Sequence, residues 1–280
     1  MNVTQMVKKS LKYPFENKKE WLLLGLVFCI IELFNGIAET LVSPELAGVI
    51  KFISLLIAVF VAGYEVSVIH HAIHELEGAP SFNWKKSLIE GFRSKVFYIL
   101  YLMIPVVIIY FVAFITGLGK NIGIVTTAIK THKYLSTVIA NQGLSDAFKI
   151  SQLSTIVPMD VINSLIAGLI ITSIVALVVI FLFVMFSVIG HIISDTHGFK
   201  HGFNHKLIFE KIGNIGWGKM LLWYISLIII AFALLILATI IAEILPFEIG
   251  VYIDMLFIIS YIFMAGFHYV GMIYTEAESE

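Results

Sequence analysis

The feature that most constrains this sequence is its set of six long apolar runs. A helix needs about 20 mostly apolar residues to cross roughly 30 Å of hydrocarbon. Lipid offers no hydrogen-bond partner to exposed backbone groups, so each run must form a helix. We therefore predict an all-α integral membrane protein that forms a single membrane domain over residues 1–280. The predicted spans lie at about 21–42, 46–69, 96–115, 161–193, 220–245 and 249–274.

Composition excludes a soluble protein. Charged residues make up 13% of the chain and hydrophobic residues 59%, whereas an ordinary soluble domain is about one quarter charged. The formal net charge of −1 gives no general attraction to nucleic acid. We expect membrane lipids as partners and no nucleic acid. The sequence does not indicate which proteins, if any, are partners. It also contains no phosphate-binding loop, nucleophile elbow or zincin motif, so we predict neither an enzyme nor a cofactor.

The distribution of lysine and arginine predicts an orientation. The short connections 43–45 and 246–248 contain neither residue, whereas the segments 1–20, 70–95 and 194–219 are rich in them. Basic connections stay on the cytoplasmic side of a membrane. We therefore expect a multi-pass protein of the cell membrane with both termini in the cytoplasm.

Residues 121–141 do not fit a span cleanly. Lys130, His132 and Lys133 lie in the middle of this semi-apolar segment and argue against one. A surface helix, a re-entrant piece and a seventh span all remain open.

Amphipathic stretches precede several spans, and we predict that they form short interfacial helices. They lie at about 82–95, 144–157 and 205–218. In the first, we expect Trp84, Lys85, Lys86 and Arg93 to face the lipid headgroups.

The first span carries a polar stripe. Glu32, Asn35 and Glu39 are three and four residues apart, which places them on one face of a helix. A carboxylate near the middle of a membrane costs about 2.5–3.5 kcal/mol on insertion scales, so intramembrane charges are candidates for function. The stripe is a candidate ion or proton path, or a polar substrate groove. The alternative is a structural role in which these groups hold helices together, and Lys51 is a possible ion-pair partner of Glu39.

Two groups of histidines are a weaker candidate for a metal site. Imidazoles suit zinc, copper, iron or nickel. The glycines between the later histidines disfavour the helix that their spacing needs, and no cysteine accompanies them. We therefore favour interfacial histidines in loops over a metal site. The candidate ligands are His70, His74, His197, His201 and His205.

A series of short motifs resembles the membrane proteins grouped as domain-of-unknown-function family 4013. Its most specific part is Gly63-Tyr64, then Pro80-Ser81-Phe82-Asn83-Trp84, then Gly91-Phe92, and the series extends to Gly143–Phe148 and beyond. The resemblance covers nearly the whole chain and implies a multi-pass, mostly archaeal family without an assigned activity. The family is usually more apolar around 122–140, where this chain departs.

Two functions follow as hypotheses. The first is binding or transport of a small solute or lipid through a polar groove at span one. The alternative is a non-catalytic, membrane-organising scaffold that acts through partner or lipid contacts.

Overall fold

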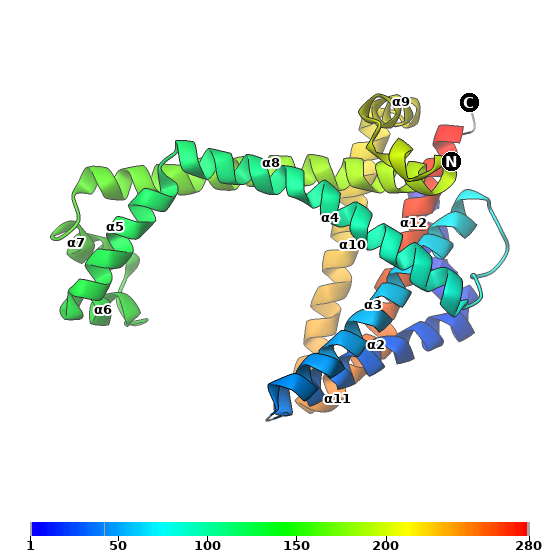
Figure 1. Ribbon diagram of the computed structural model, residues 1–280, viewed down its shortest axis with the longest axis horizontal. Helices are drawn as coiled ribbons and strands as arrows, with labels where there is room; N and C mark the ends of the chain where they lie inside the picture. The colour runs from blue at the N-terminus through cyan, green and yellow to red at the C-terminus, as the bar shows by residue number, and fades with distance from the viewer. Residues whose placement is uncertain (1, 42, 279–280) are drawn as a thin grey trace. The chain divides into compact units, whose positions relative to one another are not determined.

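The computed structural model describes residues 2–41 and 43–278, and every regular element in these ranges is a helix (Figure 1). In chain order the elements are α1 (Val3–Glu16), α2 (Lys18–Thr40), α3 (Pro44–Ile73), α4 (Trp84–Ile115), α5 (Leu118–Thr131), α6 (Lys133–Ala140), α7 (Asp146–Ser154), α8 (Met159–His197), η1 (Phe199–Phe203), α9 (His205–Ile215), α10 (Trp217–Ile244), α11 (Phe247–Ile253), the π-helix η2 (Asp254–Ile259) and α12 (Ser260–Glu278).

Six helical segments in the described chain are long and apolar enough to cross a membrane, which confirms the predicted number. Five of them are single helices: α2, α3, α4, α8 and α10. The sixth runs through α11, η2 and α12. With 39 residues, α8 is about 58 Å long at about 1.5 Å per residue, nearly twice the thickness of the hydrocarbon layer. The protein is therefore an all-α, multi-pass membrane protein.

The connections differ from the expectation in one place. The stretch 82–95 does not form a separate interfacial helix, because α4 continues without a break from Trp84 to Ile115. The stretches 144–157 and 205–218 do contain separate short helices, α7 and α9. Residues 121–141 belong to α5 and α6, which have 14 and 8 residues and are each too short to cross the membrane alone.

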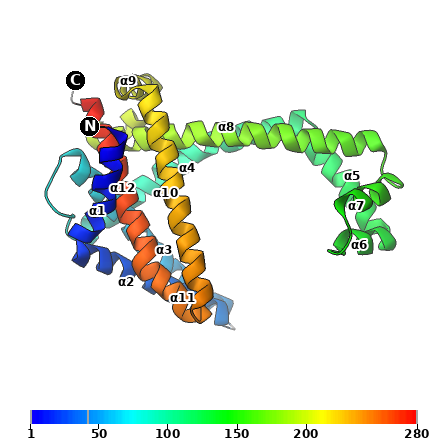
Figure 2. The same ribbon diagram turned by 180° about the vertical axis from the view of Figure 1, so that it is seen from behind.

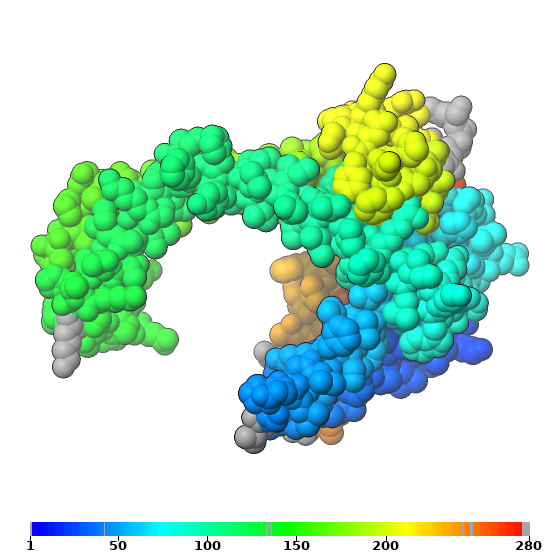
Figure 3. Space-filling model, in the orientation of Figure 1, coloured from blue at the N-terminus to red at the C-terminus, as the bar shows by residue number. Residues whose placement is uncertain are grey.

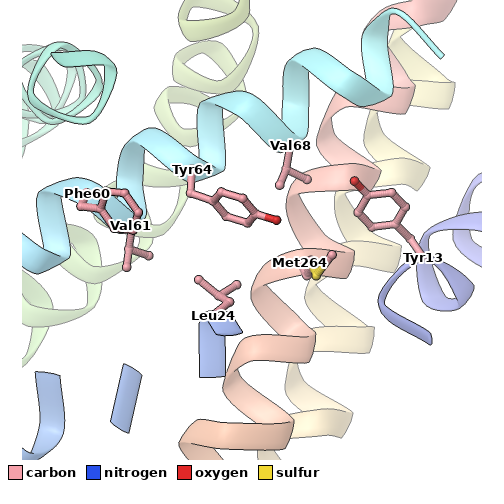
Figure 4. Packing of buried hydrophobic residues seen from close by; sticks show 7 residues of the cluster. All are labelled: Tyr13, Leu24, Phe60, Val61, Tyr64, Val68 and Met264. Atoms are coloured by element: carbon pink, nitrogen blue, oxygen red, sulfur yellow. The ribbon is translucent and has the colours of Figure 1, made fainter. Parts of the chain in front are cut away.

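The chain divides into two compact units. Unit 1 contains residues up to Ile99 and from Met185 onward, and unit 2 contains Leu100–Val184. In unit 1, α2 and α3 lie side by side, as the blue surfaces of the space-filling view show (Figure 3). Its central apolar cluster joins α1, α2, α3 and α12 (Figure 4). The buried members of the cluster are Tyr13, Leu24, Phe60, Val61, Tyr64, Val68 and Met264.

Helix α1 packs against α12, so the two ends of the chain belong to the same part of unit 1. The Ser10 hydroxyl lies 3.1 Å from His268 Nδ1 and donates to Met272 Sδ, and the Tyr261 hydroxyl donates to the Leu11 carbonyl. The view from behind shows α1 alongside α12 (Figure 2).

Glycines let α3 and the first part of α4 cross in direct backbone contact. A Cβ atom on Gly63 would lie 1.7 Å from the Ser87 carbonyl oxygen, and one on Gly91 would lie 1.8 Å from the Val59 carbonyl oxygen. Small residues at such crossings allow backbones to approach, as in other membrane helix pairs. The crossing lies close in sequence to Glu65, a buried carboxylate on α3.

Unit 2 has its own small core. Leu153, Val157 and Ile162 are buried and pack against partly buried apolar residues, including Val125 and Ile129 of α5. The short helices of this unit thus bury their apolar faces against one another, which explains why they are stable without spanning a membrane.

Candidate functional site

A polar pocket of about 330 Å³ lies in unit 1 between α1, the end of α3, the segment that follows α3, and α12. Ionisable and amide side chains line it, in contrast to the apolar side chains of the central cluster. The lining residues are Lys9, Tyr13, Glu16, Asn17, His71, Ala72, Glu75, Leu76, Glu77, Gly78 and His268.

Asn17, which ends α1, ties the segment after α3 to that helix. Its side-chain amide donates to the Tyr13 carbonyl at 2.8 Å, and its Oδ1 accepts from the Ala79 backbone N–H at 2.7 Å. The Tyr13 hydroxyl donates to the Gly78 carbonyl at 3.3 Å. These three bonds fix one wall of the pocket.

Burial, and to a lesser extent the Glu20 carboxylate, raises the pKa of the Tyr13 hydroxyl above its ordinary value. Tyr13 therefore stays protonated and keeps donating to Gly78 at neutral pH.

The two histidines of the pocket are held through their Nδ1 atoms. His71 Nδ1 lies 3.4 Å from the Gly78 carbonyl, which can only accept, so this Nδ1 carries the hydrogen. His268 Nδ1 lies 3.1 Å from the Ser10 hydroxyl. Ser10 Oγ also lies 3.3 Å from Met272 Sδ. Each imidazole is therefore anchored through its Nδ1 atom.

The charges around the pocket are mainly negative. Glu16, Glu75 and Glu77 supply three carboxylates, against the single ammonium group of Lys9. Glu75 also has a φ of 49°, in the left-handed region that residues other than glycine rarely adopt. Such backbone strain is most often found at functional sites. The pocket therefore presents many acceptors and few donors to a ligand.

The stripe of span one has a different setting. Asn35 accepts a hydrogen bond from the Ser54 hydroxyl of α3 at 3.0 Å, Glu32 is half-buried and Glu39 is exposed. Lys51 is also exposed, and no ion pair joins it to Glu39 in the described chain. None of the three stripe residues lines the polar pocket.

The histidines proposed as metal ligands do not form a ligand set. The rings of His70 and His74 lie 4.3 Å apart between centroids, and His197 Nδ1 contacts the neighbouring Thr196 hydroxyl at 2.7 Å. His201 and His205 are exposed and belong to η1 and α9. Among the described residues, no group of three or more histidine, cysteine, aspartate or glutamate side chains is placed to hold a metal ion.

The residues expected at the lipid interface separate into two kinds. Trp84 is 61% exposed while its ring stacks on Phe60 at 4.0 Å, and Lys85 is exposed. Lys86 pairs with Glu90 at 3.6 Å. Arg93 is half-buried and donates to the Ser194 carbonyl of α8. Arg93 therefore makes a contact within the protein that its position in an amphipathic pattern did not reveal.

Sequence reasoning missed the polar pocket. Neither His71 nor His268 was among the residues predicted to form a site. The one available signal was the cost of a histidine inside an apolar run, since nothing in the sequence linked His268 to Tyr13.

The comparisons with known proteins give one match. A family model described as "Protein of unknown function (DUF4013)" matches residues 46–243. No curated protein and no solved structure matches.

Proposed function

This chain belongs to the DUF4013 family of proteins of unknown function, and from that premise we propose that it is a membrane protein that binds a small organic ammonium compound. The proposed site is the polar pocket between α1, α3 and α12.

The observation that carries the proposal is the excess of acceptors in the pocket. Three carboxylates, two histidine rings and one lysine line the same cavity. An ammonium group offers up to three N–H donors and one positive charge, and so complements such a lining. The Tyr13 ring adds an aromatic face of the kind that attracts organic cations.

The size of the pocket limits the solute. Ligand pockets generally span about 300–1,000 Å³, so a cavity of about 330 Å³ suits a small molecule. A diamine or an amino alcohol fits this range, whereas a whole phospholipid does not.

The positive-inside pattern supports a cytoplasmic location for both termini, and hence for the pocket formed by α1 and α12. The protein would then meet its solute from the cytoplasm. Passage of the solute along Glu32, Asn35 and Glu39 stays a separate prediction, because no described contact links that stripe to the pocket.

The proposal is tested by calorimetric titration of the purified full chain in detergent micelles. The probes are ethanolamine and putrescine, with ethylene glycol and acetate as neutral and anionic controls. We expect saturable binding of the two amines and none of the controls. We also expect the amines to raise the melting temperature, and to raise it more at higher amine concentration, because they bind only the folded state.

Glu75→Gln and Glu77→Gln test the location of the site. Each should weaken amine binding about tenfold, which corresponds to about 1.4 kcal/mol for the loss of one charged partner. Glu210→Gln is the matched control, since Glu210 lies on α9 outside the pocket. Amine binding that is unchanged in both pocket variants, or absent at millimolar amine, would disprove the proposal.

A further inference from the structure

A second polar cluster lies within unit 1 where α3, α4 and α8 meet. His191 of α8 is 5% exposed, and Ser94 of α4 is 1% exposed. Neither ring nitrogen of His191 and no atom of the Ser94 hydroxyl has a hydrogen-bond partner in the described chain. Such buried, unpaired groups are rare in native proteins and call for an explanation.

Both side chains line the same small cavity, which measures about 10 Å³. That is about the space that one buried water molecule needs, and such a water also needs two to four polar partners. The cavity supplies them. Its lining consists of Val66, Glu90, Arg93, Ser94, His191, Ser194 and Asp195.

The cavity lies next to ionisable groups on all three helices. Glu90 pairs with Lys86 at 3.6 Å, and Arg93 donates to the Ser194 carbonyl. Asp195 interacts electrostatically with His70 and Arg93. The titratable and charged groups of this region are Glu65, His70 and His74 of α3, then Lys86, Glu90, Arg93, Lys95 and Tyr98 of α4, and Asp195 of α8.

A hydrogen-bonded pair closes the buried side of the cluster. The Tyr98 hydroxyl donates to Glu65 Oε1 at 3.3 Å, and the Tyr98 ring lies 5.1 Å from the His191 ring between centroids. His191 thus has aromatic neighbours on one side and the polar cavity on the other. Because neither ring nitrogen of His191 is hydrogen-bonded, the neutral ring has a lone pair available to accept a proton. The carboxyl groups of Glu90 and Asp195 line the same cavity.

We propose that His191 is an internal proton-binding site, and that one water molecule in the cavity carries protons between its ring and the carboxyl groups of Glu90 and Asp195. In the step, a carboxyl group gives its proton to the water, and the water gives one of its own protons to the unprotonated ring nitrogen. The products are a carboxylate, an imidazolium and an unchanged water molecule. This site is separate from the amine pocket and does not depend on it.

The test uses the full chain in micelles with ¹⁵N-labelled histidine, because the ring nitrogen shifts report protonation directly. His191→Asn identifies the His191 signals by their loss. We expect those signals to move reversibly between the neutral and imidazolium positions while the protein stays folded. Asp195→Asn should shift the midpoint of this movement measurably, because it removes a carboxyl group that lines the same cavity.

Asp160→Asn is the matched control, because Asp160 lies on the same helix but belongs to unit 2. It should leave the midpoint unchanged. His191 signals that stay at the neutral position over the whole pH range of the folded protein would overturn the proposal. So would a midpoint that is the same in Asp195→Asn and in wild type.

Two further measurements separate this result from loss of folding and from the proposed function. The far-ultraviolet circular dichroism of each variant must match that of the wild type before its titration is read. Glu75→Gln should leave the His191 signals unchanged, and Asp195→Asn should leave amine binding unchanged.

Discussion

The ring of Tyr13 on α1 stacks on the imidazole of His268 on α12, with centroids 4.0 Å apart and planes inclined by 21°. This contact joins residues that are 255 positions apart and lie in the first and last helices. It also forms part of the wall of the polar pocket. The pocket therefore depends on a contact between the two ends of the chain.

Replacement of Tyr13 by alanine should destabilise the protein by about 3–5 kcal/mol, since it removes a buried aromatic side chain from the core. Tyr13→Phe keeps the ring and loses only the bond to Gly78, so it should cost about 0.5–1.5 kcal/mol. Urea unfolding in micelles, followed by circular dichroism, measures both. Equal stability of the two variants would show that the stacked ring contributes nothing.

Tyr13 should also make the stability of the folded protein depend on pH. The pKa of Tyr13 is raised in the folded protein above the ordinary value of about 10. Its contribution to stability is then complete below about pH 10 and is lost as the pH rises through the folded-state pKa. Above about pH 10, the wild type should lose stability faster than Tyr13→Phe, by up to about 1.4 kcal/mol per pH unit. Parallel curves for the two proteins would contradict this.

The spans were predictable because length and hydropathy are local properties of the sequence. Helix α10, for example, can be recognised as a span from its own length and hydropathy, without reference to the helices around it. The start of α4 was not predicted as part of the span, because Lys85, Lys86 and Arg93 mark the end of an apolar run. A helix can nevertheless continue beyond the hydrocarbon layer, since its backbone bonds are internal.

Neither the pocket nor the α3–α4–α8 cluster was predictable from sequence. His71, His268 and Asn17 come from three separate segments, and only the packing of both α1 and α3 on α12 brings them together. His191 was not among the residues predicted to form a site. The stripe at Glu32, by contrast, was visible because regular spacing along one helix needs no tertiary contact.

The crossing of α3 and α4 predicts a strong effect of a single methyl group. Gly63→Ala would place a Cβ atom against the Ser87 carbonyl, and a backbone atom cannot move aside by changing rotamer. We expect a loss of about 1–3 kcal/mol or more, seen as a lower melting temperature in micelles.

Gly48→Ala on the same helix is the control for that variant. A Cβ atom there meets nothing within 4 Å, and alanine favours a helix over glycine by up to about 1 kcal/mol. It should therefore leave the melting temperature unchanged or raise it. A similar decrease in both variants would mean that α3 and α4 do not cross in contact at Gly63.

A double-mutant cycle tests whether the polar stripe of span one has a structural or a functional role. Asn35 accepts a hydrogen bond from Ser54, which is 5% exposed. Asn35→Ala, Ser54→Ala and the double variant should give a coupling energy of about 0.6 kcal/mol, the average for such bonds between membrane helices.

Glu32 provides the comparison for this cycle, because no hydrogen bond joins it to Ser54 in the described structure. Glu32→Gln combined with Ser54→Ala should show no coupling. If the stripe only holds α2 to α3, all these variants should also leave amine uptake into liposomes that contain the protein unchanged. A fall in uptake in Glu32→Gln without a change in stability would instead assign the stripe to a solute path. If Glu32 only held two helices together, its replacement could not lower transport while the packing of those helices stayed intact.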